Sequence, residues 1–200
     1  MLVIGLTGPS GAGKGEVSRM LREFGIPVID ADEVYHALLV PPSPCLDAIG
    51  SAFGKQILRA DGTLDRKALS AIVFSDPAQL QILNRITHSF VMERIRRDLK
   101  VLAQEGHTAA VMDAPQLFEA GADADCQITL AVLADRELRI RRIMQRDDLN
   151  EADAVRRIDA QRSDDFFRAR ADYVLENNAD PEQLRPGLVR ILTETGVLRA

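Results

Sequence analysis

The sequence contains no tryptophan and only two cysteines in 200 residues, and it has no long hydrophobic run. Cys45 and Cys126 stand far apart without metal-ligand spacing, so we expect two reduced thiols and neither a disulfide nor a zinc site. One of the longest apolar stretches, residues 126–134, holds about nine residues, far below the ~20 that cross a bilayer. Residues 1–7 show no basic segment of the kind that begins a secretory signal peptide. We therefore expect a protein that is not embedded in a membrane and that resides in the cytoplasm.

Lysine is also scarce, since only four of the 25 basic residues are lysines. The net charge of −5 argues against a general affinity for nucleic acid. Ten arginines and eight acidic residues fall between Arg136 and Arg170. Because a guanidinium group matches the oxygens of a phosphate, this window is a candidate phosphate-binding element. A solvated helix surface is the alternative.

The remaining composition is that of an ordinary globular protein, with 46% hydrophobic and 28% charged residues. The length fits one domain, or one domain with a small insertion. Five short apolar segments that alternate with helical patterns predict an α/β fold with a doubly wound, parallel five-stranded sheet, and ligands at the carboxyl ends of its strands. The expected strands are residues 2–6, 26–29, 109–112, 128–132 and 173–175. Later helices are expected at 135–147, 151–170 and 181–195, with Asn150 as a plausible N-cap.

A glycine-rich loop follows the first expected strand and precedes a helix, the context of a phosphate-binding loop (P-loop). Its glycines let backbone N–H groups converge on phosphate oxygens, and Lys14 supplies a point charge for the β and γ phosphates. The predicted ATP-binding residues are Gly8, Pro9, Ser10, Gly11, Ala12, Gly13, Lys14, Gly15 and Glu16. This loop predicts nucleotide binding.

The loop departs from the usual pattern, because Gly15 stands where Ser or Thr normally binds magnesium. Magnesium would then be held through water, by Thr7 or Ser18, or by a carboxylate elsewhere. Asp113 ends the third expected strand, where such an acid often lies. It could equally cap a helix after Pro115.

Two acidic residues, Asp30 and Asp32, follow the second expected strand. In an extended segment, residues two apart point to the same side, here toward the crevice beside the P-loop. One carboxylate could receive the proton of an acceptor hydroxyl during phosphoryl transfer. Either could instead cap the following helix.

Arginines 139, 142 and 146 have helical spacing on one face, while Ile140, Ile143 and Met144 would pack on the other. That face could grip a phosphate, or it could be a solvated surface. Asn178 follows the last expected strand and could simply turn the chain.

The order and spacing of these motifs resemble the dephospho-CoA kinase family over nearly the whole chain. The segments that carry the resemblance are 5–14, 26–32, 53–54, 61–64, 83–84 with His88, 113–119, 144–147, 171–172 and 177–178. The resemblance implies transfer of the γ-phosphoryl group of ATP to the ribose 3′-hydroxyl of dephospho-CoA, with Mg²⁺. It implies a P-loop kinase core (1–39, 107–134 and 171–200), a helical acceptor-binding region (40–106) and a helical lid (135–170).

The resemblance also implies roles for single residues. Asp32 would face the acceptor hydroxyl, Arg142 and Arg146 would stabilise the transferring phosphoryl group together with Lys14, and Asn178 would lie near the adenine. The residues implied on the acceptor side are Asp32, His36, His88, Pro115, Leu117 and Glu119. Three positions depart from the family pattern: His36 replaces an arginine, Ser89 a proline and Gln116 a leucine.

Two other functions fit parts of the sequence. The Gly13-Lys14-Gly15 sequence also suggests a nucleoside monophosphate kinase. The departures at Gly15, Glu16 and His36 suggest a nucleotide-binding protein without transfer activity. A GTPase is disfavoured because Asn177-Asn-Ala-Asp180 lacks the lysine of the guanine-binding signature. Nothing in the sequence defines an oligomeric state.

Overall fold

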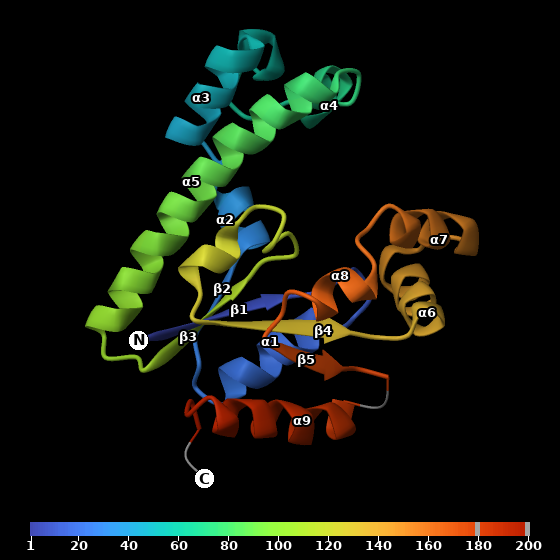
Figure 1. The fold of residues 1–200 in the computed structure, drawn as a ribbon. Coiled ribbons are helices and arrows are strands. Elements are labelled where there is room, and N and C mark those ends of the chain that lie inside the picture. The colour runs from blue at the N-terminus through green and yellow to red at the C-terminus, as the bar shows by residue number, and fades with distance from the viewer. Residues whose placement is uncertain (179–180, 199–200) are drawn as a thin grey trace. The chain divides into compact units, whose positions relative to one another are not determined.

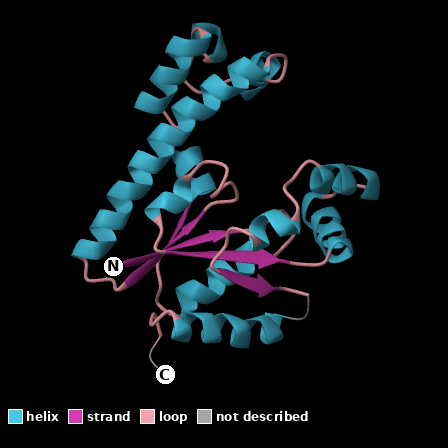
Figure 2. Ribbon diagram, viewed as in Figure 1, coloured by secondary structure: helices cyan, strands magenta, loops and turns pink. Residues whose placement is uncertain are grey.

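The computed structural model describes residues 1–178 and 181–198. The chain forms two compact units: unit 1 comprises residues 1–29 and 102–200, and unit 2 comprises residues 30–101. Unit 1 contains nearly all of the sheet, and unit 2 is mainly helical (Figures 1 and 2). Among the described residues, no helix has the length and apolar character needed to span a membrane.

A five-stranded sheet runs through unit 1 in the order β2-β3-β1-β4-β5. The strands are β1 (Leu2–Thr7), β2 (Val28–Asp30), β3 (Ala109–Asp113), β4 (Ile128–Leu133) and β5 (Tyr173–Glu176). The central strand β1 pairs in parallel with β3 on one side and β4 on the other. The predicted fold class and all five predicted strands are confirmed. Strands β2 and β3 lie on one side of β1, and β4 and β5 lie on the other. The order of the strands therefore reverses at β1, and its carboxyl end lies at a topological switch point, the usual place for a ligand.

In the described part of unit 1, helical segments accompany the strands of this sheet. They are α1 (Lys14–Glu23), η2 (Ala122–Asp125), α6 (Arg136–Asp147), α7 (Glu151–Asp159), α8 (Asp164–Arg168) and α9 (Pro181–Glu194). Asn150 caps α7 as predicted, because its side chain accepts a hydrogen bond from Asp153 N. The prediction of one helix over 151–170 is wrong. The Ser163 side chain accepts a hydrogen bond from Phe166 N and starts a separate helix, α8.

The two faces of β4 pack against different helices, as the alternation of side chains along a strand requires. Leu130 and Val132 belong to the large core formed with α1 and α9, which lie along one face of the sheet (Figure 1). Ala131 and Leu133 pack on the opposite face with Phe167 of α8. A buried strand of this kind reads as a continuous apolar run, which is why it was predictable.

Unit 2 folds around its own core. Its helices are α2 (Ala31–Leu38), α3 (Pro44–Phe53), η1 (Lys55–Ile57), α4 (Arg66–Val73) and most of α5 (Pro77–Gln104). Ser43 and Asp65 cap α3 and α4 through their side chains. The buried residues of this core are Leu39, Cys45, Leu46, Ile49, Phe53, Ile57, Leu64, Leu69, Val73 and Leu83.

Candidate active site

The P-loop connects the carboxyl end of β1 to the start of α1. Gly13 adopts a left-handed conformation, with φ of 97°, and α1 begins at Lys14 without a side-chain cap. A Cβ atom on Gly13 would lie 2.0 Å from Asn177 Nδ2, so only glycine fits here. The first N–H groups of α1 are therefore left to an external acceptor, and the helix dipole favours an anion there. This is the geometry of a phosphate site.

A buried polar cluster lies directly behind the loop lysine. Lys14 Nζ is 3.7 Å from Asp113 Oδ1, and Ser18 Oγ donates a 2.7 Å hydrogen bond to Asp113 Oδ2. Asp113 and Ser18 are 5% and 3% exposed, so solvent screens this cluster weakly. Within the described residues, the next helical segment after Asp113 is η2, which starts at Ala122, so the alternative that Asp113 caps a helix directly after Pro115 is wrong.

These residues fit a divalent cation of the magnesium type. Mg²⁺ prefers oxygen ligands and is usually held by one or two carboxylates, water and substrate phosphates. Asp113 and Ser18 offer such oxygens beside Lys14. Within the described residues, no cluster of three or more His, Cys, Asp or Glu side chains could hold a metal by itself. A cation here would thus depend on the phosphates of a bound nucleotide.

Gly15 and Glu16 lie on the first turn of α1, where Gly15 is exposed and Glu16 is half-buried. A Cβ atom on Gly15 would meet no other atom within 4 Å, so the packing does not require glycine here. Glu16 pairs with Arg19 one turn later, and the hydrogen bond from Arg19 lowers the pKa of the Glu16 carboxyl group. Glu16 therefore stays charged.

Arg142 of α6 binds carbonyl oxygens of the P-loop. Its Nη1 donates to the carbonyl oxygens of Gly11 (3.3 Å) and Ala12 (3.5 Å), and its Nη2 donates to the carbonyl oxygen of Asn177 (3.1 Å). Partial burial lowers the pKa of the guanidinium group from its ordinary value. The contacts of Arg142 thus join the P-loop, α6 and the end of β5.

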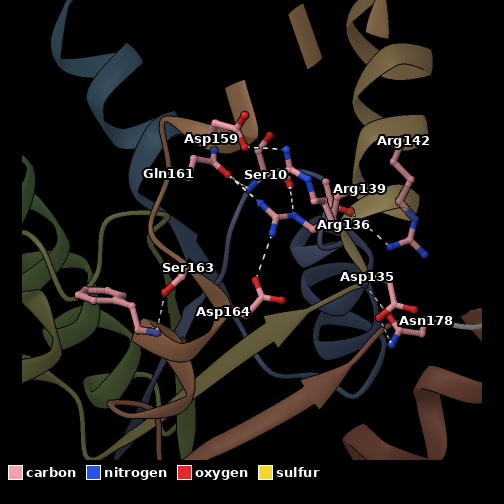
Figure 3. Close-up of polar contacts among 12 residues, drawn as sticks. Ser10, Asp135, Arg136, Arg139, Arg142, Asp159, Gln161, Ser163, Asp164 and Asn178 are labelled. Carbon is pink, nitrogen blue, oxygen red and sulfur yellow. Dashed lines mark hydrogen bonds and ion pairs between the residues drawn. The ribbon is translucent and has the colours of Figure 1, made fainter. Parts of the chain in front are cut away.

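The other two arginines of the predicted face reach Ser10. Arg139 Nε donates to the Ser10 carbonyl oxygen at 3.0 Å (Figure 3). Arg146 Nη2 donates to Ser10 Oγ at 3.2 Å. Arg139 is 4% exposed and pairs with Asp164 at 3.2 Å. The solvated-surface alternative is therefore wrong for Arg139, which binds protein groups, whereas Arg146 is exposed.

Two neighbouring asparagines after β5 have different surroundings. Asn177 is buried, and its Nδ2 donates to the carbonyl oxygen of Ala12 at 2.8 Å. Asn178 is exposed and exchanges two hydrogen bonds with Asp135, one with its backbone N–H and one with its carboxylate (Figure 3). Asn178 therefore fixes the chain at the start of α6.

The predicted acceptor-side residues of unit 2 lie on two helices. Asp30 is the N-cap of α2 and accepts hydrogen bonds from the N–H groups of Asp32 and Glu33. The expectation that Asp30 and Asp32 share one extended segment is wrong, because α2 begins at Ala31. Asp32 and His36 are one helical turn apart on α2 and both are exposed.

His36 has a basic neighbour, since Arg66 Nη2 lies 3.2 Å from His36 Nδ1. His88 lies on α5 and is half-buried. The sequence does not predict this contact, because Arg66 and His36 are 30 residues apart.

The turn after β3 carries the remaining predicted residues. The Pro115 carbonyl oxygen accepts a 3.2 Å hydrogen bond from Thr7 Oγ1, and Glu119 is exposed. Leu117 is fully buried, and a Cβ atom on Gly5 would lie 2.7 Å from its Cδ2. Leu117 thus anchors the turn from inside unit 1.

The family model for dephospho-CoA kinase matches residues 2–183 of this sequence. This chain belongs to the dephospho-CoA kinase family. A dephospho-CoA kinase of Syntrophotalea carbinolica is 42% identical over 192 residues, covering 96% of this chain and 91% of that protein. Among solved structures, TT1252 from Thermus thermophilus has a TM-score of 0.81 and 33% identity, and the dephospho-CoA kinase from Campylobacter jejuni has a TM-score of 0.72 and 27% identity. These two matches cover 96% and 98% of this chain, and 97% and 98% of the respective structures.

Within unit 1, the structure brings together most of what the sequence predicted for the nucleotide side of a dephospho-CoA kinase: the P-loop, Lys14, Asp113, Arg142 and Arg146. Three further residues, Arg139, Gln161 and Asn177, bind the loop backbone. Arg139 is indicated in the sequence by its helical spacing, and Asn177 lies in a segment that carries the family resemblance, but neither signal predicts a contact with the loop. The sequence gives no signal for Gln161.

Proposed function

We propose that this protein catalyses the transfer of the γ-phosphoryl group of ATP to the ribose 3′-hydroxyl of dephospho-CoA, giving coenzyme A and ADP. The observation that carries the proposal is a P-loop with a lysine and a buried carboxylate behind it, in a chain that matches the dephospho-CoA kinase family from residue 2 to 183. Neither rival function accounts for a match of that length.

On the nucleotide side, the residues of unit 1 bind and orient the triphosphate. The N–H groups at the start of α1 would cradle the phosphates, and Lys14 would neutralise charge on the β and γ groups. We assign the exposed Arg146 to the transferring phosphoryl group. Arg142 would act at the same place while holding the loop through Gly11 and Ala12. Asn178 would lie at the adenine.

The family's use of ATP calls for a divalent cation, and we propose Mg²⁺ near Asp113 and Ser18. When bound, this ion would neutralise charge on the phosphate oxygens. Because Gly15 supplies no hydroxyl, Asp113 would be the main protein group on the metal side. Ser18 holds this carboxylate in place through its 2.7 Å hydrogen bond.

On the acceptor side, we propose that Asp32 receives the proton of the 3′-hydroxyl as that oxygen attacks the γ-phosphorus atom. Asp32 fits this role because Asp30, and not Asp32, caps α2, which leaves the Asp32 carboxylate exposed. His36 would contact the acceptor, and Arg66 beside it would offer positive charge to this anionic substrate. His88, Pro115 and Glu119 are the other residues that we propose on the acceptor side. The buried Leu117 would support the turn that carries Pro115 and Glu119.

A panel of acceptors tests this function. ADP release would be measured with ATP and Mg²⁺ in the presence of dephospho-CoA, CMP, AMP or no acceptor. We expect turnover with dephospho-CoA alone. Turnover with CMP or AMP would assign the chain to the nucleoside monophosphate kinases. ATP binding without turnover on any acceptor would favour the non-catalytic alternative.

A further inference from the structure

The turn between α7 and α8 contacts the tip of the P-loop through one side chain, that of Gln161. Its Oε1 accepts a 3.0 Å hydrogen bond from Ser10 N and a 3.1 Å hydrogen bond from Arg139 Nη2 (Figure 3). Gln161 is thus separated by 151 residues from the loop that it contacts. A single amide oxygen joins the loop backbone to the buried arginine of α6.

The local structure places Gln161 at this point. Helix α7 ends at Asp159, and Gln161 N donates to the carbonyl oxygen of Ile158 in the turn that closes the helix. Ser163 then caps α8 two residues later. An ion pair of 2.7 Å between Arg136 and Asp159 also ties the end of α7 to the start of α6 (Figure 3). The Gln161 backbone is therefore fixed on both sides.

Side chains of residues 136–164 bind all three polar groups of Ser10. Its N–H donates to Gln161, its carbonyl oxygen accepts from Arg139, and its hydroxyl accepts from Arg146. Asp164 balances the charge of Arg139, whose pKa burial lowers and Asp164 raises. These bonds fix the position of Ser10 relative to residues 136–164, the segment that also carries Arg142 and Arg146.

We propose that Gln161 is a positioning residue for the nucleotide phosphates. By accepting from Ser10 and Arg139 together, it sets the P-loop and the arginines of α6 in one fixed arrangement before ATP binds. Preorganised donors bind a ligand more tightly, because less conformational freedom is lost on binding. Gln161 does not itself contact the reacting atoms. This inference rests on the proposed function only where KM and kcat are measured, because the Kd for ATP does not require the reaction.

The test compares three variants of Gln161. Gln161→Met keeps the length of the side chain and removes the acceptor oxygen, Gln161→Asn keeps the amide but shortens its reach, and Gln161→Glu keeps an acceptor for both donors. Gln127→Met is the matched control, since Gln127 Oε1 also accepts a backbone N–H group, that of Val3 at 2.8 Å, away from the loop. Each variant would be measured for its Kd for ATP by calorimetry, for KM and kcat, and for Tm.

We expect Gln161→Met and Gln161→Asn to raise the Kd and KM for ATP about tenfold, the scale of one lost hydrogen bond that leaves a partner unsatisfied. Gln161→Glu should stay within about threefold of the unmodified protein. Gln127→Met should change Tm alone. An unchanged Kd in Gln161→Met, or a loss in Gln161→Glu equal to that in Gln161→Met, would overturn the inference. Absence of turnover on dephospho-CoA in the unmodified protein would refute the proposed function, while the comparison of Kd values would still decide the role of Gln161.

Discussion

Replacement of Asn177 by alanine tests whether the end of β5 holds the P-loop in place. Asn177 is 5% exposed, and its Nδ2 donates to the carbonyl oxygen of Ala12 at 2.8 Å. Arg142 Nη1 also donates to that oxygen, but at 3.5 Å it is a weak substitute in Asn177→Ala. A buried carbonyl that loses its partner costs about 1–3 kcal/mol.

We therefore expect the free energy of unfolding to fall by about 2 kcal/mol, which for a chain of this size lowers Tm by about 4–8 °C. The KM for ATP should rise as well, because Ala12 lies within the loop. Gln127→Met is the control for the KM for ATP, since Gln127 Oε1 accepts a backbone N–H group, that of Val3, away from the loop. Asn177→Asp should also raise the KM for ATP, because it replaces the amide donor with an oxygen that faces the Ala12 carbonyl. Thermal unfolding and ATP titration would measure both effects. Equal Tm and KM values in Asn177→Ala and the unmodified protein would refute the reasoning.

Three further predictions follow from the site and its surroundings. Asp32→Asn should reduce kcat by ~10²-fold or more and leave the Kd for ATP nearly intact, since positioned acid-base groups contribute on that scale; unchanged kcat would remove Asp32 from the mechanism. Gly15→Ser should keep Tm, because a side chain at Gly15 meets open space. The added hydroxyl should lower the Mg²⁺ concentration that gives half-maximal activity, whereas the control Gly15→Ala should leave that concentration unchanged. Burial raises the pKa of the Cys126 thiol to about 12, so roughly one thiol in ten thousand is ionised at pH 8, and alkylation by iodoacetamide should be far slower in the folded protein than after denaturation; equal rates would contradict this.

The sequence predicted the sheet well, because strands buried on both faces appear as continuous apolar runs. The run at 128–132 corresponds to β4, which has neighbours on both sides. Strand ends were less accurate. Thr7 and Glu176 belong to β1 and β5, since a polar residue at the carboxyl end of a strand still pairs along the backbone. The helix predicted over 151–170 failed because the capping residue Ser163 lies inside an otherwise helical pattern.

The sequence predicted the local part of the site, but not the contacts that join residues far apart in the chain. Lys14 and the loop glycines form a local motif, so their spacing is visible in the sequence. Asn177 and Gln161 act on backbone groups of the loop that are more than 150 residues away, and no side-chain pattern encodes such a contact. For Arg139, the helical spacing was visible but its burial depends on the tertiary fold.

The central claim is that this chain transfers a phosphoryl group to the 3′-hydroxyl of dephospho-CoA by means of its P-loop. The most direct measurement is the mass and phosphorus-31 spectrum of the product formed from ATP, Mg²⁺ and dephospho-CoA, with Lys14→Ala run in parallel. We predict one 3′-phosphate per ADP released by the unmodified protein, and a large loss of product with Lys14→Ala. A phosphate at another position, no product, or full activity in Lys14→Ala would contradict the account.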